Sequence, residues 1–148
     1  MKILFVKPKH IGDSLILTPT IVATKKAYPD SEIWVLVRRG CDEILAGCPE
    51  IDHIRTIAPV EDSDRTGRDL WRDLLMLLNL RKVKFDYIFE LGDGHSARIF
   101  AMLSRSARLY SVKMASPPTL LERLRFAAIS SFEWQACHRV ETGFFFGG

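Results

Sequence analysis

Residues 2–19 constrain the fold more than any other segment of the chain. They read KILFVKPKHIGDSLILTP, a short apolar run followed by a basic loop, a Gly-Asp pair and a segment with helical character. We interpret residues 3–6 as a buried strand and residues 12–28 as the helix that follows it. This opening is typical of an α/β domain whose first strand delivers a polar loop to the carboxyl edge of a parallel sheet, where such folds bind ligands.

Pro19 leaves two interpretations of the first helix open. Proline removes one helical N–H group and crowds the preceding turn. Pro19 therefore either kinks a helix over residues 12–28 or begins the main helix, with Thr18 as its N-cap. In both cases the helix ends at Pro29.

Strand-like and helix-like segments alternate along the rest of the chain, with a polar stretch at residues 59–68 that predicts an exposed loop. The alternation predicts an α/β fold, a Rossmann-like parallel sheet with helices on both faces. The loops at the carboxyl ends of the strands should then meet at one edge of the sheet. The expected strands are residues 32–37, 54–57, 86–90 and 107–112, and the expected helices are residues 41–46, 69–83, 96–103 and 119–130.

Composition excludes several classes of protein. At 148 residues the chain has room for one α/β domain but not for two. The net charge of +3 is too small for the basic face of a nucleic-acid-binding protein, although it allows a moderately basic groove for an anionic sugar or phosphate. The three cysteines include no Cys-x-x-Cys pair, so we expect reduced thiols and no metal site.

The expected location of the chain is the cytoplasm, or the inner face of the cytoplasmic membrane. No segment approaches the roughly 20 apolar residues of a membrane span. Lys7 and Lys9 interrupt the apolar run at the start of the chain, so we expect no signal peptide there.

The loop after the first strand carries the candidate catalytic chemistry. It has neither the Gly-x-Gly-x-x-Gly nor the Gly-Lys-Ser/Thr pattern of a dinucleotide or nucleoside triphosphate site. Gly12 allows a tight turn, and Asp13 is expected beside a helix N-terminus, where the peptide dipoles favour an ionised carboxylate by about 0.3–1 kcal/mol. Such a carboxylate can accept a proton from a substrate hydroxyl. The alternative is that Asp13 only caps the helix.

Four basic residues are candidate contacts for an anionic acceptor. Lys7, Lys9 and His10 flank the Gly-Asp pair in the same loop. Arg98 stands at the start of a later expected helix, and its guanidinium can bind a carboxylate or phosphate with two hydrogen bonds. For each of them the alternative is an ordinary solvated surface charge.

Several motifs, spread over nearly all of residues 1–142, are similar to those of one enzyme family. The chain resembles the N-terminal domain of glycosyltransferase family 9, the ADP-heptose:lipopolysaccharide heptosyltransferases. The motifs are KPKHIGDSLILTP at residues 7–19, AYPDSEI at 27–33, PEIDHI at 49–54, FDYIFEL at 85–91, SAR at 96–98 and HRVE at 138–141.

The resemblance implies a GT-B fold, of which this chain is the N-terminal half. It also implies an inverting transfer of heptose from ADP-heptose to a Kdo or heptose hydroxyl of the lipopolysaccharide inner core, with no metal or further cofactor. By the same resemblance, Asp13 is the general base, Lys7 lies in the acceptor-side loop, and Gly12 belongs to the same motif. The acceptor is expected on this domain, and peripheral contact with the inner membrane is compatible with such a substrate.

The domain organisation that follows is an acceptor-side domain at residues 1–142 and an aberrant tail, GFFFGG, at residues 143–148. The tail reads as a misread or truncated end, or else as a natural tail that docks on the domain. Because the donor-binding C-terminal domain is absent from this sequence, we expect the chain alone to be inactive. Two other functions are considered: a non-catalytic α/β module that binds an anionic glycolipid or a partner chain, and a nucleotide-binding Rossmann enzyme, which the missing glycines disfavour.

Overall fold

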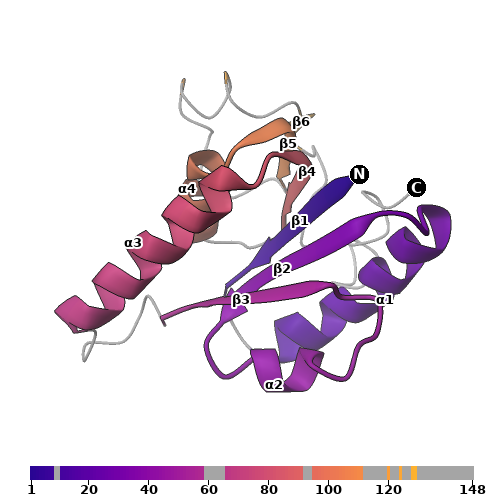
Figure 1. The fold of residues 1–148 in the computed structure, drawn as a ribbon, viewed down its shortest axis with the longest axis horizontal. Coiled ribbons are helices and arrows are strands. Elements are labelled where there is room, and N and C mark those ends of the chain that lie inside the picture. Colours follow the sequence, from indigo (N-terminus) through magenta and orange to yellow (C-terminus); the bar gives the residue numbers. More distant parts are fainter. Residues whose placement is uncertain are drawn as a thin grey trace.

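The computed structural model describes residues 1–8, 11–58, 66–91, 95–111, 120, 124 and 128–129 (Figure 1). The tail at residues 143–148 lies outside this part. The strands are β1 (Lys2–Lys7), β2 (Glu32–Arg38), β3 (His53–Ile57), β4 (Phe85–Glu90), β5 (Ser106–Ser111) and β6 (Ala128–Ile129), and the helices are α1 (Ile11–Ala27), α2 (Asp42–Leu45), α3 (Gly67–Lys82) and α4 (His95–Leu103).

Within the described residues, six strands form one parallel sheet in the order β3-β2-β1-β4-β5-β6. The chain starts at the centre of the sheet, fills one side with β2 and β3, and then returns to fill the other side from β4 onward. This order is that of a Rossmann-type sheet and confirms the predicted α/β class. The order reverses between β1 and β4, and the carboxyl ends of these two strands therefore flank the usual ligand crevice.

The central strand supplies side chains to both cores of the domain. Ile3 and Phe5 belong to the core under α1 and α2, whereas Leu4 and Val6 belong to the core under α3 and α4. Figure 1 shows these two helix pairs on opposite faces of the sheet. Strands buried on both faces read as continuous apolar runs, which is why β1 and β2 could be recognised in the sequence.

The first helix differs from one of its two predicted forms. α1 is continuous from Ile11 to Ala27 with Pro19 inside it, so the interpretation in which the helix begins at Pro19 is wrong. Pro19 lies on the exposed side of the helix, whereas Leu17 and Ile21 are buried against the sheet. Burial of this face stabilises the helix on both sides of Pro19. This stabilisation offsets the free-energy cost of the helical hydrogen bond that proline, with no N–H group, cannot donate.

The expected helix at residues 119–130 is wrong at its end. Residues 120 and 124 are helical, but Ala128 and Ile129 form β6 and pair with Tyr110 and Ser111 of β5. A strand of two residues is defined by its pairing partner and not by local propensity, so the sequence pattern could not reveal it.

α3 begins at Gly67, two residues before the predicted start, because a capping box forms there. The Thr66 hydroxyl accepts a hydrogen bond from the Asp69 amide, and the Asp69 carboxylate accepts one from the Thr66 amide. The Thr66 hydroxyl and the Arg39 guanidinium, 2.9 Å away, hold the pKa of Asp69 well below its usual range. Of the predicted loop at residues 59–68, residues 59–65 lie outside the described part of the chain.

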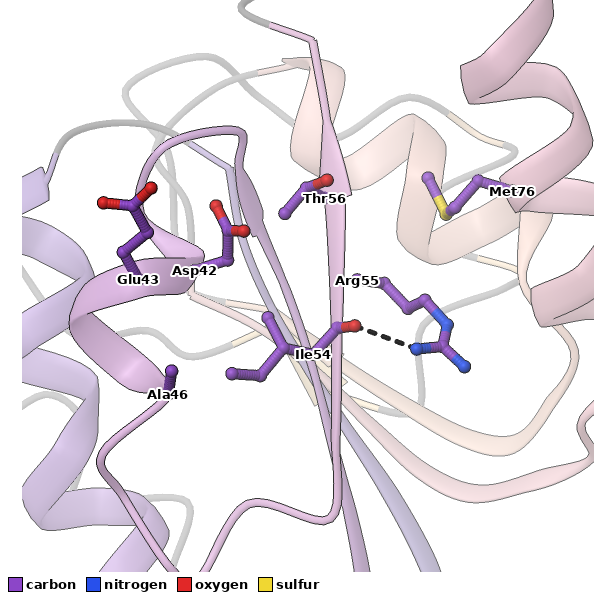
Figure 2. Close-up of a pocket in the computed structure, with 7 residues that line it drawn as sticks. All are labelled: Asp42, Glu43, Ala46, Ile54, Arg55, Thr56 and Met76. Atoms are coloured by element: carbon purple, nitrogen blue, oxygen red, sulfur yellow. Dashed lines mark hydrogen bonds between the residues drawn. The ribbon is translucent and has the colours of Figure 1, made fainter.

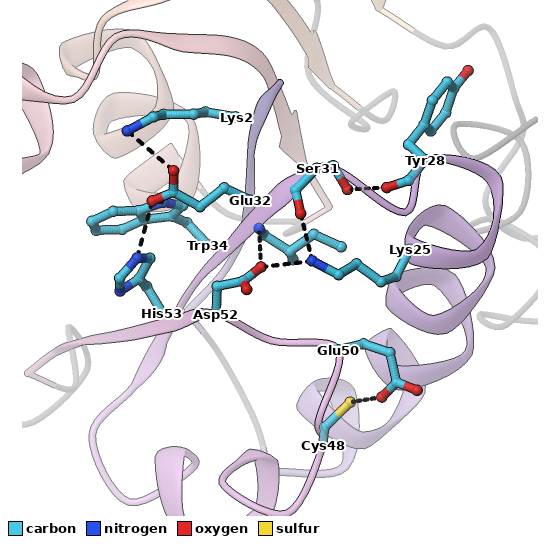
Figure 3. A network of polar contacts seen from close by, with 11 residues as sticks. Lys2, Lys25, Tyr28, Ser31, Glu32, Trp34, Cys48, Glu50, Asp52 and His53 are labelled. Atoms are coloured by element: carbon cyan, nitrogen blue, oxygen red, sulfur yellow. Dashed lines mark hydrogen bonds and ion pairs between the residues drawn. The ribbon is translucent and has the colours of Figure 1, made fainter.

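A carboxylate at the amino edge of the sheet joins three elements (Figure 3). Asp52 Oδ2 accepts a hydrogen bond from the Ile33 amide of β2 at 2.7 Å and another from Lys25 Nζ of α1 at 3.1 Å. Lys25 also donates to the Ser31 carbonyl at 2.5 Å. Burial alone would raise the pKa of Asp52, but the Ile33 amide and Lys25 outweigh burial and hold the pKa below its usual value.

Because the pKa of Asp52 is lower in the folded chain than in the unfolded chain, its contribution to stability is present above the unfolded pKa and is lost as the pH falls through the folded pKa. We expect Asp52→Asn to lower the melting temperature at pH 7. Below about pH 4, where the wild-type carboxylate begins to be protonated, the difference in melting temperature between the variant and wild type should become smaller. Thermal denaturation followed by circular dichroism between these pH values measures the difference. Asp30→Asn removes the same charge at an exposed turn and is the matched control. A difference that stays constant with pH would contradict the prediction.

Candidate functional site

The candidate site lies at the carboxyl edge of the sheet, where the strand order reverses (Figure 1). β1 and β4 pair in parallel up to Val6 and Glu90, and β4 pairs with β5 up to Ser111. Most of the predicted site residues follow β1 in the sequence, between its end at Lys7 and the first turn of α1. The segment between β4 and α4 follows Glu90. The ends of these strands therefore set the position from which both segments start.

Lys7 forms a hydrogen bond that links the ends of β1 and β4. Its side chain is buried, with 7% of the residue exposed, and Nζ donates a hydrogen bond to the Leu91 carbonyl at 3.1 Å. The Leu91 amide in turn donates to the Val6 carbonyl at 3.1 Å. Lys7, predicted as an acceptor contact, therefore lies at the candidate site. At least one of the three N–H groups of its ammonium is used in a hydrogen bond to the backbone at the end of β4.

A buried ion pair stands on the other face of the same edge. Glu90 is fully buried, and its Oε2 accepts a short hydrogen bond from the Ser111 hydroxyl and lies 3.9 Å from Arg98 Nε. Arg98, predicted as an acceptor contact, is only 3% exposed. We call Lys7, Glu90, Leu91, Arg98 and Ser111 the carboxyl-edge cluster. Its contacts join β1 to the end of β4 on one face of the sheet, and β4 to β5 and α4 on the other.

The predicted catalytic aspartate lies in the first turn of α1. Asp13 is the third residue of that helix, so its backbone position is inside the helix and not at the N-cap. Its side chain lies outside the described part of the structure, as do Lys9 and His10. The position next to the helix N-terminus agrees with the sequence analysis, whereas the choice between base and structural role stays a prediction.

Gly12 does not make the tight turn expected of it. It is the second residue of α1, and its φ is not in the left-handed region, unlike that of Gly40 at +90°. A Cβ added at Gly12 would meet no atom of the described structure within 4 Å. Among the described residues, no atom therefore crowds the position of a side chain at Gly12, and the backbone conformation there does not require glycine.

The sequence analysis missed Glu90 and Ser111. The available signal was an acidic residue at the end of FDYIFE, where an otherwise apolar buried strand has no reason to carry a carboxylate unless a partner is present. Ser111 has no such signal, because its role depends on the register between β4 and β5.

A groove in the described part of the structure is lined by other residues than the candidate site (Figure 2). It is an open groove of about 480 Å³ beside β3, the outermost strand on its side of the sheet. In Figure 2, Asp42 and Glu43 lie on one side of β3 and the Arg55 side chain extends along the other, so these charges do not converge on one ligand. None of the predicted site residues lines the groove. The lining residues are Asp42, Glu43, Ala46, Ile54, Arg55, Thr56 and Met76.

The described residues contain no group of three or more side chains suited to hold a metal ion. Cys41 and Cys48 are present as thiols, and Cys137 lies outside the described part. Among the helices of that part, none has the length and apolar character needed to cross a membrane.

Comparison with known proteins points to one family of enzymes, although no family model matches the chain. The chain is 32% identical over 92 residues to lipopolysaccharide heptosyltransferase 3 of Escherichia coli. Its fold superposes on E. coli heptosyltransferase WaaC with ADP at a TM-score of 0.79 and 16% identity. The resemblance to glycosyltransferase family 9 is confirmed. A family 9 glycosyltransferase from Veillonella parvula superposes with a TM-score of 0.76 and 16% identity.

The chain spans only part of each of these proteins. The sequence match covers 62% of this chain and 26% of heptosyltransferase 3. The structural matches cover 97% of this chain but 45% of WaaC and 39% of the V. parvula protein. At 16% identity the superpositions establish a shared Rossmann-like fold and leave activity and substrate to separate argument.

Removing one partner of the buried ion pair should destabilise the fold. We expect Arg98→Ala to lower the free energy of unfolding by about 3–5 kcal/mol, because the Glu90 carboxylate then stays buried without its cation. Arg98→Met combined with Glu90→Gln should cost less than Arg98→Ala alone. Urea denaturation measures these differences, and the exposed Arg105→Ala should change stability by no more than about 0.5 kcal/mol. Equal effects of Arg98→Ala and Arg105→Ala would contradict the assignment.

Gly12→Ala should leave the fold intact, because its Cβ has open space and its φ suits any residue. We expect the free energy of unfolding to stay constant or to rise by up to about 1 kcal/mol, since alanine favours helix over glycine. Gly40→Ala is the matched contrast and should destabilise by about 1 kcal/mol or more, because φ is +90° there. If Gly12→Ala destabilises as much as Gly40→Ala, the glycine has a structural role.

Proposed function

We propose that the chain is the acceptor-side, N-terminal half of a heptosyltransferase of glycosyltransferase family 9. The reaction is an inverting transfer of heptose from ADP-heptose to a Kdo or heptose hydroxyl of the lipopolysaccharide inner core. The observation that carries the proposal is the 32% identity over 92 residues to a lipopolysaccharide heptosyltransferase, because a shared fold alone does not imply a shared reaction. The proposed location is the cytoplasm, at the inner face of the cytoplasmic membrane.

In this proposal Asp13 is the general base. Its carboxylate takes the proton of the acceptor hydroxyl while the hydroxyl oxygen attacks the anomeric carbon of heptose. The bond from that carbon to the ADP oxygen breaks, and ADP leaves with the bonding electrons. The backbone position of Asp13 in the first turn of α1 supports this role, because peptide dipoles there stabilise the carboxylate that must be ionised before the reaction.

The other predicted residues serve the acceptor side of the same site. Lys9 and His10 are proposed to contact the anionic inner core, and Gly12 leaves room for the acceptor beside the helix. Lys7 and Arg98 are proposed to act through the carboxyl-edge cluster, by holding the strand ends from which the acceptor-side segments start. No metal ion has a role in this scheme.

The donor ADP-heptose would bind outside residues 1–142, because the chain spans only 26% of heptosyltransferase 3 and 45% of WaaC. Holding donor and acceptor in one geometry supplies about 7–11 kcal/mol of catalysis, which outweighs the contribution of a single base. We therefore propose that residues 1–142 act together with a donor-binding domain and are inactive alone, and that residues 143–148 have no part in the reaction.

The test is transfer from ADP-heptose to a Kdo-containing acceptor. Residues 1–142 are fused to the remaining part of E. coli lipopolysaccharide heptosyltransferase 3, and the fusion is compared with the 148-residue chain. We expect activity in the fusion only, and a fall in kcat of about 10²–10⁴-fold in the fusion with Asp13→Asn. Asp30→Asn is the control for an exposed aspartate.

A folded fusion without activity would contradict the proposal and favour a non-catalytic module that binds an anionic glycolipid or a partner chain. A fusion in which Asp13→Asn is as active as wild type would leave the transfer reaction standing but remove Asp13 as its base.

A further inference from the structure

One face of α3 carries a continuous set of exposed apolar side chains. Leu70, Leu74 and Leu78 repeat every four residues, and Trp71 and Leu75 form the adjacent row. Between 43% and 61% of each of these five residues is exposed, with Trp71 the most exposed. Single exposed apolar residues are common on protein surfaces, but two adjacent rows along one helix mark an interaction surface. We call these five residues the α3 stripe.

The α3 stripe has no role in the core of the domain. The opposite side of α3 packs on the sheet through Leu80, which is buried, and through Met76 and Leu77, which are partly buried. That side also carries Asp73, whose Oδ1 accepts a hydrogen bond from the Ala58 amide at 3.2 Å. In Figure 1, α3 lies along one side of the domain, on the face of the sheet opposite α1 and α2.

The exposed charged residues that belong to α3 itself have one sign. Of the two acidic residues of α3, Asp73 is buried and Asp69 is engaged by Thr66 and by Arg39. The exposed charged residues of the helix are therefore all cationic. They are Arg68, Arg72, Arg81 and Lys82.

We propose that α3 docks on a membrane surface that contains anionic lipids. A tryptophan and leucines on one face of a helix, flanked by arginine and lysine, fit the boundary between lipid headgroups and acyl chains. Each exposed cation near an anionic bilayer adds electrostatic attraction to lipid phosphates. A second copy of the chain fits this face less well, because a symmetric contact would bring the same cations together with no exposed acid of α3 to neutralise them.

One ion pair attaches the start of α3 to the segment that follows β2. Arg39, just after β2, pairs with Asp69 in the first turn of α3 at 2.9 Å. The start of α3 is thereby attached to the carboxyl edge of the sheet, where the site also lies. The inference goes beyond the proposed transfer reaction and does not depend on it.

The test is co-sedimentation of the full 148-residue chain with vesicles of phosphatidylcholine alone and of phosphatidylcholine mixed with phosphatidylglycerol. We expect binding to the mixed vesicles that weakens with added salt, and at least tenfold weaker binding to the neutral ones. Leu74→Ser should weaken binding by about tenfold, because a large apolar side chain no longer enters the bilayer. Ile44→Ser, an exposed isoleucine on α2, is the matched control and should bind as wild type.

Two further variants separate the apolar and electrostatic contributions. Arg72→Glu should weaken binding to the mixed vesicles by at least about fivefold, whereas Lys26→Glu, on the exposed surface of α1, should have a smaller effect. Tryptophan fluorescence should shift to shorter wavelength on the mixed vesicles, and Trp71→Phe should abolish most of the shift. Circular dichroism confirms that each variant is folded.

Several outcomes would overturn the proposal. They are equal binding to both kinds of vesicle, binding that the α3 variants leave unchanged, and no binding by the folded chain. A dimer in analytical ultracentrifugation that Leu74→Ser dissociates, without vesicle binding, would assign the α3 stripe to a second copy. None of these results bears on the transfer assay, so failure here and failure of the proposed function are distinguishable.

Discussion

The domain depends on the parallel pairing of β1 with both β2 and β4. β1 is buried on both faces and paired on both sides, so its four central residues contribute to two cores and two ladders at once. The same pairing sets the position of the candidate site, because β2 and β4 lie on opposite sides of β1 and the strand order reverses there. The two hydrophobic cores and the candidate site thus meet at one strand.

The carboxyl-edge cluster shows how polar groups can be kept inside such a fold. A charged side chain taken out of water costs several kcal/mol unless partners compensate it. Here Glu90 has Ser111 and Arg98, and Lys7 has the Leu91 carbonyl. These contacts tie the ends of β1, β4 and β5 to one another and to α4 at the edge of the sheet where the candidate site lies.

Most of the fold could be predicted from the sequence, because strands buried on both faces and amphipathic helices leave clear apolar patterns. The predictions failed where a distant partner decides the structure. β6, which replaces the end of the predicted helix, exists only through its pairing with β5. For α1 the sequence left two interpretations open, and burial of Leu17 and Ile21 on both sides of Pro19 favours the continuous helix that is found.

The candidate site was predicted less completely than the fold. Lys7 was predicted as an acceptor contact in the loop, with a solvated cation as the alternative. In the structure β1 extends to include Lys7, and the carbonyl that accepts its hydrogen bond is 84 residues away in the sequence. Arg98 was predicted as an acceptor contact, with a surface charge as the alternative, but its side chain is buried and lies beside Glu90 of β4. Asp13 was placed correctly near the start of a helix, because the strand-to-helix transition is visible locally. Its role as a base was carried by a family resemblance and stays a prediction.

The outermost position of β3 has a consequence for behaviour at high concentration. An outer strand offers backbone groups to which another chain can add, and natural proteins oppose this with short strands and charged side chains. β3 has five residues, and Arg55 both donates to the Ile54 carbonyl at 2.9 Å and covers the Trp34 ring at 4.8 Å. The Arg55 guanidinium, held in this way, places a charge beside a backbone carbonyl of β3 with which an added strand would otherwise pair. Arg55 therefore acts as a gatekeeper against edge-to-edge aggregation.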